Sequence, residues 1–578
     1  MLKTKIFIVL TLVLIGGVLM FSACDTDGGS TPAGAVVIGG ADGELPPEGP
    51  DTNNGRPFNS TPTAWDDRDA SRYLHGVNLT VLPIASEPVE IELWRPFNST
   101  VIQTLEESEV WQEMERRTGV RVNWSHPPVG QTNENFSLRI AADDLPHAFV
   151  NPPPFPGGPA AAVEEGIYIE LTPYYEAGWL PNFAWLRSNH PQAAEISRGT
   201  TDDLGRILAL HMIDIIPSHP WSGLWIRQDY LDSYGLDVPA TIQDWDHVLR
   251  TWRDSRGSWV LGLEYPDTPG GTGGIQTNFA FVGSFDAGFR RWLNLDGQAV
   301  HGSIQPGYGE WLALMNSWFT DGILDPDFAV RTGEDRYTQV ANGNFLAFDR
   351  AYGGMGQQLL TGRTHTPEMA VTPLGNPARA PGAHVRISSQ NNSIVRGDRT
   401  HITDRVHNEG NTEIVVRWFD YLFSQDGGDL MSYGLFGHTS RWDANGEIEW
   451  IHPILTEDED ADFWTPVYLF KMRPMSFLRD STAYVFVDEV WECIRVWGAA
   501  DNSGILPTDL MTLTPDEAAE MAGIMVDVDT HIYEQTLAFI VGSRPLDQFD
   551  AFVAELESMG IRRAEEIQQA AFERLLVR

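Results

Sequence analysis

Hydrophobic and polar residues follow two periods along most of the chain, and these periods predict both strands and helices. Residues 89–93 alternate apolar and polar side chains, which indicates a half-buried strand. After Thr241 the apolar positions recur at i, i+3, i+4 and i+7, which is one face of a helix: Trp245, Val248, Leu249 and Trp252. Asp244, three residues after Thr241, predicts a capping box at the start of this helix.

The same periods continue toward both ends of the body. Residues 108–119 predict a helix that begins at Ser108 and ends at Gly119, and residues 120–124 predict the strand after it. Near the end an apolar stripe predicts another helix: Phe549, Phe552, Val553, Leu556 and Met559. Strands that alternate with helices predict an α/β body, and 578 residues are enough for two lobes.

The first 24 residues fit a lipoprotein signal. Lys3 and Lys5 form a basic start, and residues 6–21 are an uncharged apolar run. The sequence Phe21-Ser22-Ala23-Cys24 then resembles a lipobox, with Phe where Leu is usual. A transmembrane anchor is the alternative, but the run is shorter than the roughly 20 residues that a spanning helix needs. We therefore expect removal of residues 1–23 and a palmitate-type lipid anchor on Cys24, in the inner or the outer membrane.

The segment that follows predicts a tether. Residues 24–87 are rich in Gly, Pro, Asp, Asn, Ser and Thr and are expected to be disordered, with some ordered packing near residues 73–83. The folded body is expected over residues 88–578. Cys493 lies in an apolar stretch and has no partner once Cys24 is acylated, so it predicts a buried, inert thiol.

Composition narrows the partners. A net charge of −41 argues against nucleic acid, which needs a basic protein face, and disfavours polyanionic ligands unless arginines cluster locally. The chain has 20 Trp, 15 Tyr and 27 Phe, whose flat rings suit stacking on sugars. Core packing is the alternative for each of these rings.

Enzyme signatures give no support to catalysis. The chain has no nucleophile elbow, H-E-x-x-H, P-loop or C-x-x-C motif, and residues 270–274 indicate a flexible loop rather than a dinucleotide site. Because 80 acidic residues supply many chance pairs, no glycosidase carboxylates can be chosen. Residues 443–446 indicate a turn rather than a calcium loop. We expect no cofactor and no catalysis.

One central run reads Trp225-Ile226-Arg227-Gln228-Asp229-Tyr230-Leu231, followed by residues 235–239 and 241–245. This run resembles a motif of family 1 extracellular solute-binding proteins of ABC importers, in particular of their lipoprotein members. Further matching stretches follow the family's order: 111–115, 118–120, 144–147, 165–167, 171–173, 539–542 and 549–560. His147 stands where the family usually has Asp, and residues 434–437 lack its usual Glu. Residues 254–257 are too short for the calcium loop of alginate-binding relatives, so no metal is predicted.

The resemblance implies a two-lobed, periplasmic-binding-protein-like (type II) clamp. Its lobes would be discontinuous and joined by hinge strands, with the first crossing near residues 211–223. Lobe 1 is expected over about 88–215 and 370–437, and lobe 2 over about 220–365 and 440–578. The implied function is capture of a sugar or oligosaccharide by a monomer that delivers it to ABC permease subunits.

The resemblance also suggests where ligand would bind. Residues 151–158 are similar in position to a cleft loop of the first lobe, and residues 343–352 resemble a strand whose end delivers an aromatic ring. Sugar recognition combines planar polar groups with an aromatic face. The polar candidates are Asn151, Asp286, Asp349 and Arg350, and the candidate platforms are Phe155, Trp221, Tyr352 and Trp442. A structural role is the alternative for each, and an ion pair within one lobe explains Arg227 and Asp229 equally well.

Two other functions stay open at this stage. A secreted glycan-acting enzyme would turn over an oligosaccharide that a binding protein returns intact. A sensor lipoprotein would present its ligand to a membrane receptor rather than to a permease. Among cargoes, uronate oligomers compete with neutral sugars, but the acidic charge and the lost calcium loop disfavour them. Non-sugar cargo also stays open.

Overall fold

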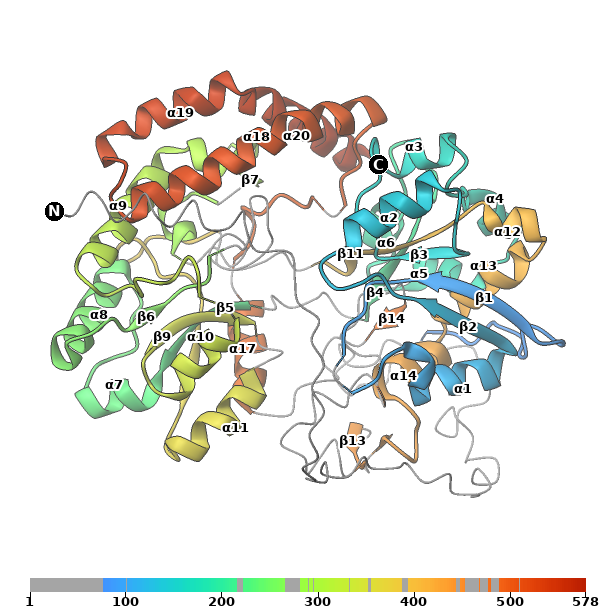
Figure 1. Cartoon of the computed structure of the whole chain (residues 1–578), viewed down its shortest axis with the longest axis horizontal. Coiled ribbons are helices and arrows are strands. Elements are labelled where there is room, and N and C mark those ends of the chain that lie inside the picture. Colours follow the sequence, from blue (N-terminus) through green and yellow to red (C-terminus); the bar gives the residue numbers. More distant parts are fainter. Residues whose placement is uncertain are drawn as a thin grey trace, which may run out of the picture. The chain divides into compact units, whose positions relative to one another are not determined.

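Two β-sheets organise the part of the chain that the structure describes (Figure 1). This computed structural model describes residues 76–578 except 100, 216–221, 266–280, 289–290, 295, 332, 352–354, 387–392, 443–447, 453–466, 468–476, 480–487, 500 and 509. Three predicted residues, Cys24, Trp221 and Tyr352, lie outside the described residues. Lobe 1 is used below for the first sheet and its core, and lobe 2 for the second.

The first sheet has the strand order β14-β4-β11-β3-β1-β2. Its strands are β1 (Val89–Trp94), β2 (Val120–Ser125), β3 (Ala148–Val150), β4 (Leu210–Asp214), β11 (Val395–Ile402) and β14 (Leu478–Arg479). β1 is parallel to β2 and β3, whereas β11 is antiparallel to β3 and β4. Parallel neighbours need crossover connections, which α1 (Glu109–Thr118) and α2 (Thr132–Ala141) supply.

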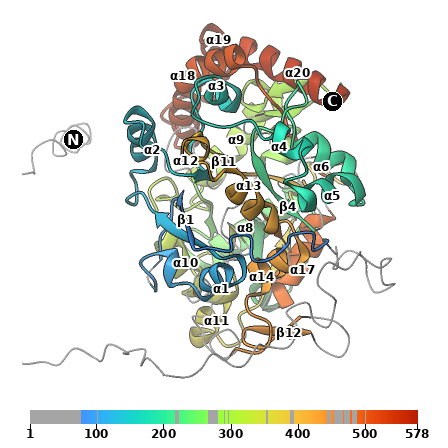
Figure 2. The same cartoon turned by 90° about the vertical axis from the view of Figure 1, so that its right-hand side faces the viewer.

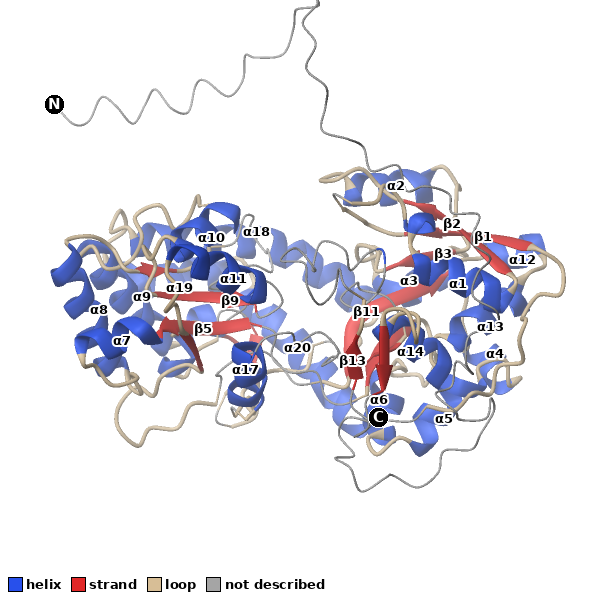
Figure 3. Ribbon diagram, turned by 90° about the horizontal axis from the view of Figure 1, so that it is seen from below, coloured by secondary structure: helices blue, strands red, loops and turns tan. Residues whose placement is uncertain are grey.

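The second sheet has the order β10-β5-β9-β6. Its strands are β5 (Ser222–Arg227), β6 (Leu261–Gly262), β9 (Ala347–Ala351) and β10 (Val371–Leu374). β5 is antiparallel to both β9 and β10. Figure 3 shows helices on both sides of β5 and β9. Two hairpins stand outside these sheets: β7 (Arg291–Leu293) with β8 (Ala299–His301), and β12 (Ser440–Trp442) with β13 (Ile448–Trp450).

Helices surround both sheets. In lobe 1 they include α3 (Gly158–Glu164), α4 (Thr172–Glu176), α5 (Pro181–Asn189), α6 (Ala193–Gly199), α12 (Arg405–Glu409), α13 (Thr412–Tyr421) and α14 (Gln425–Tyr433). In lobe 2 they include α7 (Gln228–Tyr234), α8 (Ile242–Arg256), α9 (Pro306–Thr320), α10 (Gly333–Ala341), α11 (Met355–His365), α17 (Asp488–Gly498), α18 (Pro515–Ile540) and α19 (Phe549–Ser558). The last helix is α20 (Ile561–Val577).

The elements with the strongest sequence pattern are confirmed. α8 begins at the predicted capping box, where the Asp244 N–H donates to Thr241 Oγ1 over 3.2 Å, and its four predicted apolar residues are all buried. α1 ends at Gly119 in a left-handed conformation with φ 71°. A Cβ atom at Gly119 would lie 2.3 Å from the Ala85 carbonyl oxygen, so only glycine fits there. α19 carries the predicted stripe, with Phe552 and Leu556 fully buried.

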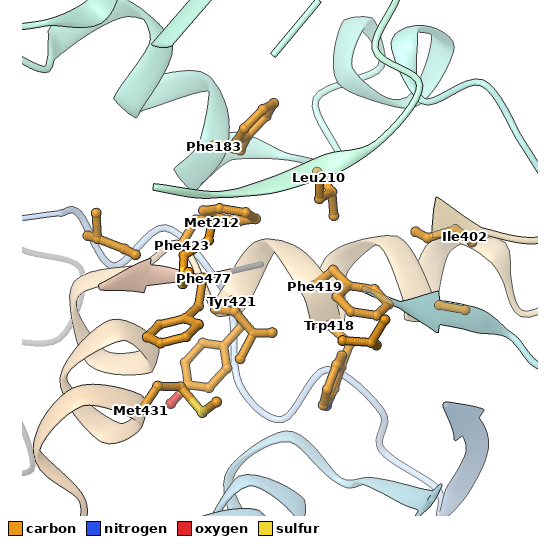
Figure 4. Packing of buried hydrophobic residues seen from close by; sticks show 14 of the residues in the cluster. Phe183, Leu210, Met212, Ile402, Trp418, Phe419, Tyr421, Phe423, Met431 and Phe477 are labelled. Carbon is orange, nitrogen blue, oxygen red and sulfur yellow. The ribbon is translucent and has the colours of Figure 1, made fainter. Parts of the chain in front are cut away.

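Large aromatic side chains fill both cores. In lobe 1, α13 lies beside β4 and β11 (Figure 2), and Figure 4 shows Trp418 and Phe419 of α13 near Leu210 of β4 and Ile402 of β11. In lobe 2, α8 and α9 contribute buried indoles: Trp245, Trp252, Trp311 and Trp318. Many of the aromatic residues that the composition offered for sugar stacking are therefore core residues.

Two strands differ from the expected lobe boundaries. We expected residues 370–437 in lobe 1, but β10 pairs with β5 of lobe 2 from Val371 opposite Arg227 to Leu374 opposite Leu224. We expected residues 440–578 in lobe 2, but β14 pairs with β4 of lobe 1. Backbone pairing of short strands decides both assignments, and it leaves little trace in the hydrophobic pattern. The chain therefore returns to lobe 1 only after β10.

The folded body begins earlier than the composition predicts. Residues 76–87, which we assigned to the tether while allowing some ordered packing near residues 73–83, pack on lobe 1, and Val77, Asn78 and Thr80 are buried. The Asp426 N–H, at the start of α14, donates to Asn78 Oδ1 over 2.8 Å. The N–H groups of Ile84 and Ala85 both donate to the Thr118 carbonyl oxygen at the end of α1. The side chains and backbone groups of this segment satisfy helix ends of lobe 1.

Asp420 links this segment to the core. Its carboxylate is buried and accepts hydrogen bonds from the Asn182 N–H (3.1 Å), the Asn182 side-chain amide (2.7 Å) and the Phe183 N–H (2.9 Å). The same amide also donates to Thr80 Oγ1. Burial raises the pKa of Asp420 to about 7, although these donors lower it.

Cys493 is free and buried, so the predicted burial of this thiol is confirmed. Burial, followed by the Glu492 charge, raises its pKa, which disfavours the reactive thiolate. Arg227 is fully buried and forms an ion pair with Asp229 in the same lobe. Among the described residues no helix combines the length and the hydrophobicity needed to cross a bilayer.

A chain that begins at Pro88 should be less stable than one that begins at Gly76. It loses a buried valine, leaves the N–H groups of Gln425 and Asp426 at the start of α14 without their partners, and removes two hydrogen bonds of the Asn182 side chain in α5. We therefore expect a loss of about 3 kcal/mol in the free energy of unfolding. Urea unfolding monitored by Trp fluorescence measures the difference. Val81→Ala is the control, because Val81 is 76% exposed and its truncation should change little. Equal stability of the two chains would show that this segment adds nothing to the fold.

Asp420 should make the stability of lobe 1 decrease as the pH rises from about 4 to about 7. The folded state keeps the Asp420 proton up to its raised pKa of about 7, while the unfolded state releases it near the usual 3.8. The folded state therefore binds more protons in this window, and each pH unit removes up to about 1.4 kcal/mol of stability.

The variant Asp420→Asn should abolish this slope. It should also lower stability at pH 5 by about 1–3 kcal/mol, because an amide nitrogen cannot accept from the backbone N–H groups of α5. Urea unfolding at pH 5 and pH 8 tests both expectations, with the exposed Asp237→Asn as control. An unchanged slope in Asp420→Asn would assign the pH dependence to other groups.

Candidate functional site

The topology of the first sheet identifies one of its edges as a candidate ligand-binding site. β2 lies on one side of β1 and β3 on the other, so the crossover direction reverses between β1 and β3. In sheets of this kind ligands bind outside the carboxyl ends of the strands at such a switch point. β1 is followed by Arg95 and β3 by Asn151. β4 is in the same orientation, so Asp214 also ends at this edge, just before the chain leaves for lobe 2.

Asn151 and Phe155, the two predicted residues after β3, differ in their surroundings. Asn151 has a left-handed backbone (φ 50°), and its N–H donates to the Arg399 carbonyl oxygen over 2.8 Å. This bond fixes the residue at the end of β3 while its side chain is half-buried. Phe155 is only 9% exposed and packs against Tyr168, with ring centroids 6.0 Å apart. Phe155 thus belongs to a small core, together with Trp94 and Phe149, and exposes little of its ring.

The sequence analysis missed an aromatic pair at the same edge. Phe97 follows β1 and His126 follows β2, and their rings lie 4.9 Å apart with 39° between the planes. Both side chains are half-buried. His126 Nδ1 is 2.9 Å from the Arg95 carbonyl oxygen, which positions its ring. Burial lowers the pKa of His126, so near neutral pH the ring is uncharged.

This pair is the outer end of a row of rings that runs into the core of lobe 1. His126 stacks on Trp124 (6.2 Å, 10°), Trp124 meets Trp111 edge-on (4.8 Å), and Trp111 stacks on Trp418 (6.0 Å, 22°). A ring that is held by such packing loses little conformational freedom when a ligand binds. The signal that could have found Phe97 and His126 is their position directly after two parallel strands.

In lobe 2 the predicted residues Asp349 and Arg350 lie at the end of β9. They are opposite Leu224 and Gly223, at the beginning of β5, where the chain arrives from lobe 1. Asp349 is buried and accepts a hydrogen bond from the Glu264 N–H over 2.8 Å. The Arg350 carbonyl oxygen accepts from Trp225 Nε1 over 3.1 Å. The two residues therefore sit at the edge of the second sheet from which the crossing to lobe 1 departs.

The approach of β5 to α17 also restricts this edge. A Cβ atom at Gly223 would lie 2.7–2.9 Å from the Trp497 indole ring, which leaves no space for a side chain. Trp497 in turn donates its indole N–H to the Leu374 carbonyl oxygen at the end of β10. The ends of β9 and β10 and the beginning of β5 are thus held in a fixed arrangement.

Asp286 and Trp442 lie on other segments. Asp286 has φ 52° and forms a 3.2 Å ion pair with Arg386, which also donates to the Leu293 carbonyl oxygen. It thereby ties the connection between β10 and β11 to lobe 2. Trp442 belongs to the β12–β13 hairpin, where its ring packs with Phe436 (5.6 Å) and Tyr433 (5.7 Å) in a cluster apart from both main cores.

His211 and His401, near the first edge, add no charge at neutral pH. Burial, followed by the charge of the nearby Arg399, lowers the pKa of both to about 3. His401 stacks on Tyr168 with 4.4 Å between ring centroids. Within the described ranges no group of three or more His, Cys, Asp or Glu could hold a metal ion. The described edges offer rings, amides and a few fixed charges, which suits recognition of a polar molecule with apolar faces.

Comparison with known proteins gives relatives at low identity. No family model matches the chain. Lipoprotein LipO of Bacillus subtilis is 25% identical over 223 residues, which is 38% of this chain and 41% of LipO. The fructooligosaccharide ABC transporter substrate-binding protein FusA of Streptococcus pneumoniae is 20% identical over 473 residues, which is 78% of this chain and 84% of FusA.

Solved structures match over much more of the chain. Alginate-binding protein AlgQ2, solved without calcium, has a TM-score of 0.68 at 19% identity and covers 85% of this chain and 99% of its own. FusA in complex with kestose gives 0.67 at 17% identity over 84% and 99%, and an HMO-binding solute-binding protein of Bifidobacterium longum infantis gives 0.65 at 15% over 85% and 99%. The predicted architecture is thus confirmed: the chain has the two-lobed α/β fold of the extracellular solute-binding proteins of ABC transporters.

Proposed function

We propose that this chain is a membrane-tethered, extracytoplasmic solute-binding protein that captures a sugar or oligosaccharide and delivers it to an ABC permease. The observation that carries the proposal is the fold, shared over 84–85% of the chain with the alginate-binding protein AlgQ2 and with FusA in complex with kestose. The relatives with this fold are binding proteins, and the role proposed here requires no catalysis. Affinity and lobe closure are then the whole function.

The placement of the candidates at two sheet edges supports capture by lobe closure. Asn151, Phe97 and His126 belong to lobe 1, whereas Asp349 and Arg350 belong to lobe 2. A ligand that contacts both edges binds the closed conformation better than the open one and shifts the population toward closure. In this proposal the rings take the apolar face of a sugar, and the amide, carboxylate and guanidinium groups take its hydroxyls. Trp221 and Tyr352 stay candidates on the sequence alone.

Neutral oligosaccharide is the cargo that the charge favours. With a net charge of −41, a polyanionic uronate chain would be repelled as it approaches. Binding in the micromolar range, about −8 kcal/mol, needs only a few stacks and charged hydrogen bonds. AlgQ2 is named for alginate, so its fold is compatible with an acidic cargo, and the measurement below includes one.

The anchor and the partner complete the proposal. Cys24 would carry the lipid, and the roughly 50 residues between it and Gly76 would act as a flexible tether with a reach of about 40 Å. Such a reach lets a monomer stay near the permease while its lobes open and close. LipO, a relative that carries the name lipoprotein, supports this location.

A thermal-shift screen tests the function directly. The full chain in detergent is titrated with neutral fructooligosaccharides, other neutral oligosaccharides and acidic uronate oligomers. A ligand at 100 times its dissociation constant should add about 2.7 kcal/mol to the stability and raise the melting temperature by some degrees. The sugar should be recovered intact after incubation. Cleavage of the sugar would indicate an enzyme, and the absence of any shift across the panel would contradict a carbohydrate-binding function.

Loss of the Phe97 ring should weaken binding of whichever oligosaccharide gives the largest shift. Phe97→Ala removes one stacking face, worth about 1 kcal/mol, so we expect a five- to tenfold increase in the dissociation constant by calorimetry. Phe319→Ala is the matched control and should keep wild-type affinity, because Phe319 is a half-buried ring near the end of α9 that packs against Phe328 in lobe 2. If Phe97→Ala also keeps wild-type affinity and cooperative unfolding, the Phe97–His126 pair is not part of the ligand site.

A further inference from the structure

The last helix is built into both lobes. At its beginning α20 places Ile561, Ala564 and Ile567 in the core of lobe 2. At its end Leu575 is buried in the core of lobe 1, and Phe572 packs against the same core. A helix of 17 residues is about 25 Å long and resists bending, so α20 is a rigid connection between the two cores. Figure 3 shows β5 and β9 on one side of α20. On the other side the chain ends beside α6.

Polar contacts hold the first part of α20 to lobe 2. Glu565 accepts the His301 N–H over 2.7 Å, and Gln569 accepts the Ala299 N–H over 2.8 Å, so both bind strand β8. Arg563 forms a bidentate pair with Glu520 of α18, with both distances 2.9 Å. These bonds fix the helix in rotation as well as in position.

A cluster of charges holds the other end of α20 to lobe 1. Asp203, in the loop after α6, accepts from both Arg574 and Arg578. Arg578 also donates to backbone carbonyl oxygens of lobe 1 and of the approach to α18: Arg198 (2.9 Å), Thr201 (2.5 Å) and Leu510 (3.1 Å). The Arg578 side chain is only 8% exposed, so its charge is held by these oxygens rather than by water.

The same cluster includes the start of α18. Arg574 pairs with Glu517, and Glu517 is the third residue of α18 and part of its capping box with Thr514. Arg574 also donates to the Thr512 carbonyl oxygen over 3.1 Å. Asp203, Arg574, Arg578 and Glu517, here called the Asp203 cluster, therefore join three segments at one point: a loop of lobe 1, the start of α18 and the end of α20.

We propose that the Asp203 cluster is a lock that keeps the end of α20 fixed on lobe 1, so that α20 limits how far the lobes can move relative to each other. The chain passes between the lobes at the strand connections, and α18 also contacts α3 of lobe 1. A rigid helix anchored in both cores adds a further restraint and narrows the range of lobe orientations. None of the ligand candidates belongs to the cluster.

The restraint has a consequence for affinity. A protein whose lobes already occupy few orientations loses less conformational entropy when a ligand closes it. If freer motion lowers the fraction of molecules whose lobes are in a binding-competent orientation, the apparent dissociation constant rises in inverse proportion to that fraction. Opening the Asp203 cluster should therefore widen the distribution of lobe orientations first and weaken binding as a result.

Distances between spin labels measure the lobe distribution without any ligand. Cysteines are placed at Leu138 on α2 of lobe 1, which is 60% exposed, and at Asp254 on α8 of lobe 2, in a full chain with Cys24→Ser. Cys493 is buried and stays unlabelled. Pulsed electron–electron double resonance then gives the distance distribution for the wild-type background, for Asp203→Ala and for Arg563→Ala. The Arg563 variant is the matched control, because its ion pair joins α20 to α18 within lobe 2.

Asp203→Ala should at least double the width of the distance distribution, and Arg563→Ala should leave it unchanged. Asp203→Asn, which keeps one acceptor oxygen, should give an intermediate width and serves if the alanine variant does not fold. An unchanged width in a cooperatively folded Asp203→Ala or Asp203→Asn protein would overturn the proposal. Equal widening in Arg563→Ala would do so too, because it would point to general loosening of α20. Since no ligand is added, the result does not depend on the proposed function.

Discussion

The backbone pairing of the two strands that begin after the lobe crossings holds the whole architecture together. β5 starts lobe 2 and lies inside the second sheet, bonded to β9 and β10 on its two sides. β11 starts the return passage and lies inside the first sheet, bonded to β3 and β4. Because inner strands have both edges paired, neither passage can detach without breaking two ladders. The crossings are thereby forced to leave from defined edges, and those edges carry Asn151 in lobe 1 and Asp349 and Arg350 in lobe 2.

Core packing accounts for many of the aromatic residues. Among the residues that the structure describes, eight indoles are essentially inaccessible, namely Trp94, Trp225, Trp245, Trp252, Trp311, Trp318, Trp418 and Trp497. A buried aromatic ring removes about 150–250 Å² from water, so a large two-lobed protein gains more from such rings inside than at its surface. A high content of aromatic residues therefore does not by itself indicate sugar stacking. The row from Trp418 to Phe97 shows how the two roles combine, since core rings hold a half-buried ring at the edge.

Sequence reasoning succeeded where the signal was local or repeated along the chain. α1, α8, α19 and the first two strands each have their own period or cap, and the ordered motifs gave the fold. It failed where partners lie far apart. Asn78 bonds the start of α14 almost 350 residues later, so its segment looked like tether. His147, which replaces the family's Asp, accepts the Glu92 N–H and contacts Glu409, 262 residues away.

The candidate site divides in the same way. Asn151 directly follows a predicted strand, and Asp349 and Arg350 lie near the end of another, so the sequence could place them at sheet edges. Only the packing of the folded protein shows that the ring of Phe155 belongs to a small core. Asp286 looked like a hydroxyl partner, yet its neighbour is Arg386, 100 residues away in the chain. Phe97 and His126 were absent from the prediction because neither belongs to a recognisable motif. Their importance comes from two parallel strands ending at the same edge, which is a property of the sheet and not of either segment.

Lobe 1 is the part of the molecule on which the outside connections converge. Residues 76–87 are bonded to α14, α5 and α1, which all belong to lobe 1, and the end of α20 is bonded there as well. Both segments are therefore fixed to lobe 1, whereas the first part of α20 belongs to the core of lobe 2. The buried Asp420 lies between residues 76–87 and the core of lobe 1, so its hydrogen bonds to Asn182 and Phe183 stabilise the lobe to which both segments attach.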